Sequence, residues 1–148
     1  MVEERVPRIL LVEDNPGDVV LVRRSLLDLG APHELEVADD GVEALGRLRR
    51  DGRHVDAQPV DLVLLDINLP RMDGHEVLAA MKADADLRRI PVVVLTSSSA
   101  DADVLRAYDH HANAYLTKGF GLGELSETLR CLMAFWVGRV TLPPRVDG

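Results

Sequence analysis

The sequence is poor in cysteine and has no long apolar run. Cys131 is its only cysteine, which excludes an internal disulfide bond and a metal site built from several thiolates. No apolar run approaches the roughly 20 residues that a membrane-spanning helix needs, and residues 1–8 lack the basic start and apolar middle of a signal peptide. We therefore expect a cytoplasmic protein with no membrane association.

The sequence also lacks a basic stripe and blocks of like charge. Its formal net charge is −8, which argues against nucleic-acid binding as the main activity. Its 148 residues, 47% of them hydrophobic, suffice to bury one core, so the length predicts one domain. We place this domain at residues 7–137 and a C-terminal tail at 138–148.

Short apolar runs recur along the chain and alternate with amphipathic segments. The apolar runs predict strands at residues 8–12, 33–38, 60–65, 91–95 and 113–116. The amphipathic segments predict helices at residues 16–29, 41–50, 74–83, 99–110 and 122–137. Alternation of this kind indicates a parallel sheet with right-handed crossovers, so the fold class is α/β: a doubly wound, five-stranded, flavodoxin-like domain.

Helix starts carry predicted N-caps. Asn15 precedes Pro16 at the start of the first helix, and Asp40 stands three residues before a glutamate as a capping box for the second. Ser98 and Asp101 have the same spacing and predict a capping box for the fourth helix.

Charged and hydroxyl residues follow the predicted strands. Glu13 and Asp14 come after the first strand, Asp66 after the third, Thr96 ends the fourth, and Lys118 follows the fifth. All carboxyl ends of a parallel sheet lie on one edge, where such folds keep their sites, so we expect these side chains to meet. Three carboxylates and one ammonium sum to −2, a charge that Mg²⁺ would cancel with oxygen ligands. A carboxylate can also attack a phosphoryl group, whose developing charge needs a metal, an ammonium and a hydroxyl donor.

The motifs at these strand ends resemble the receiver domain of two-component response regulators. They are Glu13 with Asp14, the segment from Asp66 to Gly74, Thr96 with Ser97, and the segment from Tyr115 to Lys118, within a match over about residues 7–135. The resemblance implies that Asp66 accepts a phosphoryl group from a histidine kinase. It also implies that Mg²⁺ is bound by Asp14, by Asp66 and by the backbone carbonyl of Asn68, while Glu13 acts through a water.

The resemblance further implies that Lys118 pairs with the phosphoryl oxygens and that Thr96 and Tyr115 form a switch pair. Such a protein is not an enzyme acting on other molecules, since it catalyses only its own phosphoryl transfer and slow dephosphorylation. The chain ends soon after the last predicted helix, so no output domain is expected. Phe135 with Trp136, and the segment 140–143, resemble stand-alone receivers that are paired with phytochrome-type histidine kinases.

Two positions depart from the family pattern. Gly119 stands where the family usually has a proline, so this loop is expected to be trans or mobile and to hold Lys118 less firmly. His111 stands where the family usually has glycine, at a helix end that favours a left-handed residue. We interpret His75, His110 and His111 as solvated surface residues.

Two alternative functions remain. A haloacid-dehalogenase-type phosphatase also uses a strand-end aspartate with Mg²⁺, but it needs a second aspartate two residues later, where this chain has Asn68. A pseudo-receiver would be an interaction module with a vestigial site. Gly119 favours that alternative slightly, while retention of every acidic position weakens it.

The end of the chain is rich in large apolar residues. Of five aromatic residues, two are Phe135 and Trp136, and their neighbours Met133 and Val137 make a set too wide for one buried helical stripe. We therefore expect a homodimer built on the face of the C-terminal helix, helped by the helix and strand before it. The alternative is that the tail folds back over Trp136 within one monomer.

Overall fold

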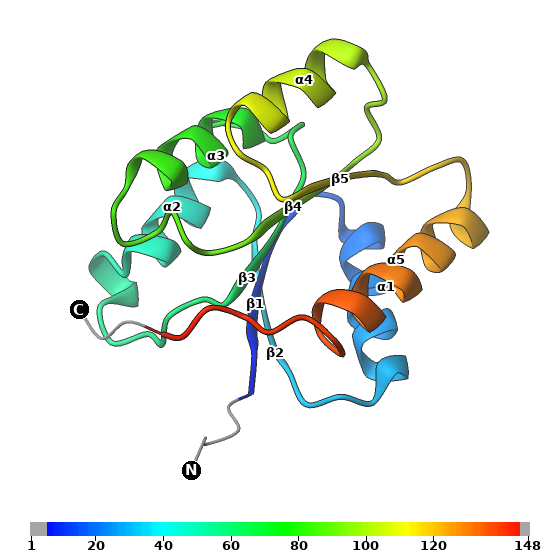
Figure 1. Cartoon of the computed structure of the whole chain (residues 1–148), viewed down its shortest axis with the longest axis horizontal. Coiled ribbons are helices and arrows are strands. Elements are labelled where there is room, and N and C mark those ends of the chain that lie inside the picture. The colour runs from blue at the N-terminus through cyan, green and yellow to red at the C-terminus, as the bar shows by residue number, and fades with distance from the viewer. Residues whose placement is uncertain (1–5, 146–148) are drawn as a thin grey trace.

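A computed structural model describes residues 6–145 and shows one parallel sheet between two layers of helices (Figure 1). The strand order is β2-β1-β3-β4-β5, as in a doubly wound sheet. The strands are β1 (Arg8–Val12), β2 (Glu34–Ala38), β3 (Leu62–Leu65), β4 (Val92–Thr96) and β5 (Ala114–Thr117). The predicted fold class is therefore confirmed.

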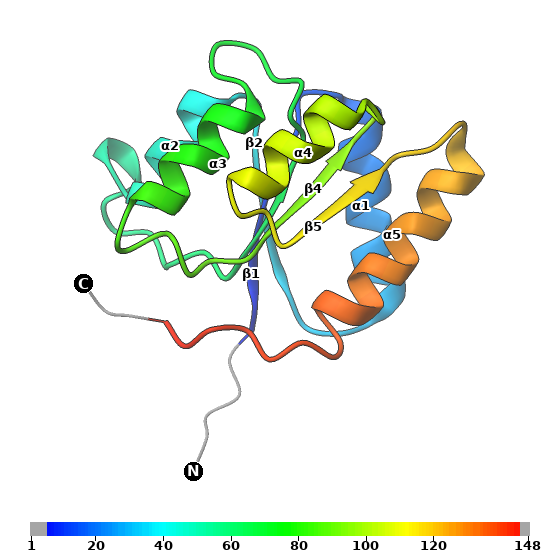
Figure 2. The ribbon, with the colours of Figure 1, turned by 45° about the horizontal axis from the view of Figure 1, so that its top comes forward.

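Helices cover both faces of the sheet. They are α1 (Pro16–Leu29), α2 (Gly41–Arg49), α3 (Gly74–Ala83), α4 (Asp101–Asp109) and α5 (Leu122–Trp136), with a short 3₁₀ turn, η1 (Gly52–His54). Helices α1 and α5 lie on one face and α2, α3 and α4 on the other, each over its own apolar cluster (Figures 1 and 2). Within residues 6–145, no helix combines the length and the apolar character needed to cross a membrane.

Strand β3 shows why the apolar runs are continuous. Its four residues are fully buried, because Val63 and Leu65 point into the cluster under α2 and α3 while Leu62 and Leu64 point into the cluster under α1 and α5. A strand covered on both faces has no polar side, so it delivers Asp66 to the edge of the sheet from a rigid position.

Two of the three predicted caps are present. Asn15 accepts backbone N–H groups in the first turn of α1, and Asp40 does so for α2. The predicted capping box of Ser98 with Asp101 is wrong, because α4 begins after Ala100 and has no side-chain cap. The Ser98 hydroxyl instead donates to Asp103.

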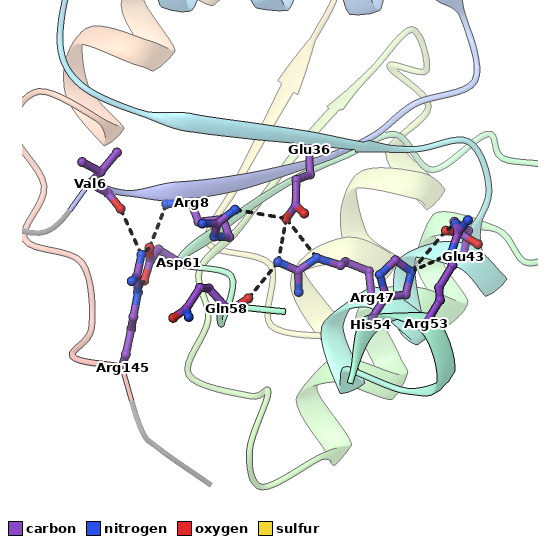
Figure 3. Close-up of polar contacts among 10 residues, drawn as sticks. All are labelled: Val6, Arg8, Glu36, Glu43, Arg47, Arg53, His54, Gln58, Asp61 and Arg145. Carbon is purple, nitrogen blue, oxygen red and sulfur yellow. Dashed lines mark hydrogen bonds and ion pairs between the residues drawn. The ribbon is translucent and has the colours of Figure 1, made fainter. Parts of the chain in front are cut away.

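The C-terminal segment 138–145 runs back across the amino-terminal edge of the sheet (Figure 2). There the Arg145 guanidinium donates to both carboxylate oxygens of Asp61, at 3.0 and 2.6 Å, and to the carbonyl oxygen of Val6 at 2.9 Å (Figure 3). Asp61 also accepts the backbone N–H of Arg8, which opens β1. One buried carboxylate thus joins the two ends of the fold.

The apolar residues at the end of α5 are mostly covered. Met133 is fully buried, and Trp136 and Val137 pack half-buried on the same cluster as Leu142 of the tail. Phe135 keeps 57% of its surface exposed and meets Trp136 edge to face. The tail therefore packs on the same apolar cluster as Trp136, and Phe135 is left facing outward.

Candidate functional site

The acidic residues predicted for the site meet at the carboxyl-terminal edge of the sheet. Glu13 and Asp14 follow β1, and Asp66 follows β3, which is the neighbour of β1 in the sheet. Carboxylate oxygens of all three lie within 4.8 Å of one another. Glu13 and Asp66 are buried, whereas Asp14 is exposed, so the cluster opens toward solvent on the side of Asp14.

Lys118 lies at the centre of these acids and is 7% exposed. Its ammonium donates to Asp18 Oδ2 at 2.7 Å, to Asp66 Oδ2 at 3.0 Å and to Glu13 Oε1. Burial alone would lower the pKa of Lys118, but its hydrogen bonds to Asp18, Glu13 and Asp66 raise it above the usual value, so the side chain stays charged. Three carboxylates thus contact the ammonium, and the expectation that Gly119 leaves Lys118 less firmly held stays a prediction.

Asp66 is held as an ionised carboxylate. Its Oδ1 accepts the backbone N–H of Asn68 at 3.0 Å, and its Oδ2 accepts from Lys118. Burial would raise the pKa of Asp66, but hydrogen bonds with Glu13, with the Asn68 backbone and with Lys118 outweigh burial and lower it below its usual value. Ionisation leaves Asp66 in the form that can act as a nucleophile.

Glu13 carries the electrostatic strain of the cluster. Burial, together with the hydrogen bond to Asp66 and its charge, raises the pKa of Glu13 to about 8, although Lys118 acts in the opposite direction. The cluster therefore holds more negative charge than its one ammonium can balance. Its ligand atoms are all hard oxygens, which suit Mg²⁺ or a similar divalent cation. The residues thus fit the predicted metal, and the expected acidic metal-binding cluster is present.

The two residues predicted as a switch pair lie on neighbouring strands, next to this cluster. Thr96 is fully buried at the end of β4, and its Oγ1 is 3.4 Å from the backbone nitrogen of Ser98 and 3.5 Å from Nδ2 of Asn68. Tyr115 lies on β5, and its hydroxyl donates to the carbonyl oxygen of Ser98 at 2.8 Å. One loop residue, Ser98, therefore contacts both side chains.

Sequence reasoning missed two residues near the site. Asp18 was not predicted for the site, and the signal of its role is that it lies in the first turn of the helix that follows Glu13 and Asp14. His75 was expected to be solvated but is 4% exposed, with its Nε2 at 3.2 Å from Asp103 Oδ1. The packing of α3 against α4 buries His75, and no local pattern in the sequence announces that contact.

Comparisons with known proteins agree with this geometry. The family model described as the response regulator receiver domain matches residues 9–130. Response regulator Rcp1 of Synechocystis sp. is 44% identical over 135 residues, which are 91% of this chain and 92% of Rcp1.

Solved structures show the same fold. The crystal structure of the phosphorylated cyanobacterial phytochrome response regulator RcpA superposes with a TM-score of 0.91 at 43% identity, covering 95% of this chain and 100% of that chain. The Mn²⁺-bound form of response regulator Rcp1 also gives a TM-score of 0.91 at 43% identity, over 93% of this chain and 99% of that chain. The similarity therefore extends over nearly the whole of each chain and is not limited to the acidic cluster.

Proposed function

The chain belongs to the response regulator receiver domain family, and from that premise we propose that it is a phosphoacceptor signalling protein that takes a phosphoryl group on Asp66 from a histidine kinase. One observation carries the proposal. Asp66 is buried and ionised, and it contacts Lys118 beside two further carboxylates. Receiver domains work with histidine kinases, and the acidic cluster is their divalent-metal site.

The transfer is a nucleophilic substitution at phosphorus. A carboxylate oxygen of Asp66 forms a P–O bond while the bond between phosphorus and the donor atom breaks, and the donor keeps that electron pair. Lys118 pairs with the negative charge on the transferred oxygens. Asp14, Asp66 and the backbone carbonyl of Asn68 would bind Mg²⁺, with Glu13 acting through a water, and the bound ion would supply further positive charge at these oxygens.

The response to phosphorylation is assigned to Thr96 and Tyr115. In the proposal the Thr96 hydroxyl turns toward the phosphoryl group, and the Tyr115 ring turns inward behind it. Support comes from their positions next to Asn68 and Ser98, on the two strands that follow β3 in the sheet.

Acetyl phosphate with Mg²⁺, followed by intact mass, tests the assignment. The wild type should gain one phosphoryl group, Asp66→Asn should gain none, and Asp39→Asn, which removes an exposed acid at the end of β2, should behave as the wild type. Turnover without an adduct would instead support the phosphatase, against which Asn68 already argues. Absence of an adduct in the wild type would support the pseudo-receiver.

The kinase in the proposal is of the phytochrome type. Support comes from the similar protein RcpA, which is a cyanobacterial phytochrome response regulator. A phytochrome-type kinase should transfer its phosphoryl group to this protein faster than an unrelated histidine kinase does. Equal rates from both donors would contradict this choice of partner.

We also propose a homodimer on the face of α5, together with α4 and β5. Phe135 on α5 is 57% exposed, while Leu105 and Tyr108 on α4 are 65% and 48% exposed. Contiguous exposed patches of large apolar residues usually mark protein–protein interfaces. Analytical ultracentrifugation of the wild type and of Phe135→Ala, with and without acetyl phosphate, tests this. A wild type that stays monomeric at high micromolar concentration in both states would end the dimer proposal.

The domain boundary and the location complete the proposal. The receiver domain spans residues 7–137 and the tail spans 138–148, supported by the end of α5 at Trp136. The site of action is the cytoplasm, which agrees with the sparse use of cysteine.

A further inference from the structure

Two segments of the fold approach each other closely beside the acidic cluster. One is the start of α2, and the other is the connection 66–73 between β3 and α3, which carries Asp66 and Asn68. A Cβ at Gly41, the first residue of α2, would overlap the carbonyl oxygen of Met72. Glycine at this position therefore lets α2 lie directly against the backbone of the connection.

The connection contains a tight turn centred on Arg71. The N–H of Met72 donates to the carbonyl oxygen of Pro70 at 2.7 Å, so the turn closes over three residues. Arg71 has φ = 66°, the sign that belongs to the strained form of such a turn and that is unfavourable for a residue with a Cβ. A conformation of this kind persists only where the surrounding structure holds it. The turn therefore needs contacts from outside the connection.

Asp40 supplies a charged contact to this turn. Its Oδ2 accepts from Nη1 of Arg71 at 3.1 Å, while its Oδ1 accepts the backbone N–H of Glu43 at 2.8 Å as the N-cap of α2. The side chain of Asp40 is 13% exposed and that of Arg71 is 63% exposed. One carboxylate thus contacts both segments, with one oxygen inside α2 and the other reaching the turn.

Further contacts tie the connection to the acidic cluster. The N–H of Asn68 donates to Asp66 Oδ1 at 3.0 Å, and the N–H of Gly74 donates to the carbonyl oxygen of Ile67 at 3.0 Å. Between Asn68 and the turn stands Pro70, whose ring fixes its φ and leaves the chain little freedom. A displacement of the turn would therefore move the backbone of Asn68 relative to the carboxylates.

We propose that Asp40 and Arg71 are positioning residues for the metal, whose ion pair holds the connection 66–73 where the carbonyl of Asn68 can bind the divalent cation. The inference rests on the proposed function, in which that carbonyl is a metal ligand. Neither side chain is part of the acidic cluster, so the pair acts through the backbone. Partners that stand behind metal ligands in this way set the affinity for the metal without binding it.

Three single variants test the pair. Asp40→Asn keeps an N-cap of equal quality but removes the charge, and Arg71→Gln removes the guanidinium. Arg71→Lys keeps a cation for Asp40. The matched controls are Asp39→Asn, which removes the exposed acid before Asp40, and Arg49→Gln, which removes an exposed arginine of α2.

The measurement is the dependence of the melting temperature on Mg²⁺ concentration, which reports both the stability without metal and the dissociation constant for Mg²⁺. Asp40→Asn and Arg71→Gln should each weaken Mg²⁺ binding about two- to tenfold, less than loss of a fully buried partner would, because Arg71 is exposed. The double variant should bind no more weakly than either single variant, because loss of one partner already breaks the pair. Arg71→Lys and the two controls should match the wild type.

The sign of the Arg71 effect separates positioning from simple electrostatics. Removal of a positive charge near a cation site should tighten Mg²⁺ binding, whereas removal of a negative charge should weaken it. Unchanged or tighter binding by Arg71→Gln or by Asp40→Asn would overturn the proposal, even if the melting temperature without metal falls. If Asp40→Asn does not fold, Arg71→Gln decides alone. If the wild type does not respond to Mg²⁺, the metal site of the proposed function fails, and the inference fails with it.

Discussion

At the scale of single residues, His111 adopts a conformation that costs free energy. It follows α4 with φ = 67°, in the left-handed region where a Cβ is unfavourable by about 1–2 kcal/mol. His111→Gly should therefore raise the free energy of unfolding by about 0.5–1 kcal/mol, after allowance for the greater flexibility of glycine in the unfolded chain. Urea denaturation measures the change.

The neighbouring histidine provides the control for this prediction. His110 has φ = −89°, which any residue adopts, so His110→Gly should lower the stability of the protein. Equal effects of the two substitutions would mean that the backbone conformation at His111 carries no cost.

Glu13 makes the stability of the metal-free protein depend on pH. Its pKa is about 8 in the folded protein and about 4.5 in the unfolded chain, so the folded state binds the proton more tightly. The contribution of Glu13 to the free energy of unfolding is fully present below pH 4.5 and is lost as the pH rises toward 8. The loss amounts to a few kcal/mol, since each pKa unit corresponds to about 1.4 kcal/mol. In EDTA, the melting temperature should fall over this range, and Glu13→Gln should flatten the profile.

Magnesium should reverse this trend. A divalent cation among Glu13, Asp14 and Asp66 favours their ionised forms, so the melting temperature near pH 8 should rise with Mg²⁺ concentration. Asp14→Asn should weaken the response, whereas the exposed Asp39→Asn should leave it unchanged. A melting curve that is indifferent to millimolar Mg²⁺ would count against the metal site.

The residues that sequence analysis placed correctly are those fixed by local pattern. Asp66 and Lys118 follow strands whose ends lie on one edge of a parallel sheet, so their meeting follows from topology alone. His75 was misjudged because its burial depends on how α3 packs against α4. The contact between Lys118 and Asp18 was also missed, because it depends on Asp18 reaching across from α1.

At the scale of elements, the loop between β5 and α5 requires glycine. Gly119 has φ = 76°, and a Cβ there would overlap the carboxylate of Glu124, which accepts the backbone N–H of Phe120. Proline cannot adopt this φ, so a loop with this conformation cannot have the family's usual proline at position 119. The loop contains no cis peptide bond. The greater mobility expected for residues 117–123 stays a prediction.

Two alanine substitutions separate the role of Gly119 from a general effect of flexibility. Gly119→Ala should lower stability by about 1–2 kcal/mol, because it forces a Cβ into the left-handed region and displaces Glu124. Gly123→Ala, in the first turn of α5 with open space around it, should raise stability by about 0.5–1 kcal/mol. If both substitutions stabilise the protein, the loop does not depend on the conformation of Gly119.

Element boundaries were predictable to within a few residues where the pattern was strong. Strand β1 and helices α1 and α3 have the predicted bounds, since a run buried on both faces or a good cap defines each end. The start of α4 was predicted two residues early, because Ser98 and Asp101 fit a capping box on paper. In the fold, the Ser98 hydroxyl donates to Asp103 and its oxygen accepts the N–H of Ala100, which precedes α4, so α4 has no side-chain cap.

At the scale of the whole molecule, the tail closes the amino-terminal edge of the sheet. Pro143, Pro144 and Arg145 line a cavity of about 170 Å³ there, together with residues from α2 and from the loop before β4. This edge lies opposite the acidic cluster, so the tail can stabilise the fold without touching the phosphorylation site. The sequence hinted at a tail that folds back over Trp136, but the pairing with Asp61 joins residues 84 positions apart and has no local signature.

The last prediction concerns the contribution of this tail to stability. Asp61 is 4% exposed, and Arg145→Ala would remove the guanidinium that donates to both its oxygens. A buried charge that loses a partner is costly, so the free energy of unfolding should fall by about 1–3 kcal/mol, which for a chain of this size lowers the melting temperature by about 2–4 °C per kcal/mol. Arg139→Ala removes an exposed arginine of the same tail and should change little. Labelling of Asp66 by acetyl phosphate should be unaffected by either substitution, because both lie far from the acidic cluster. Equal melting temperatures for the two variants would show that the tail rests on the sheet without stabilising it.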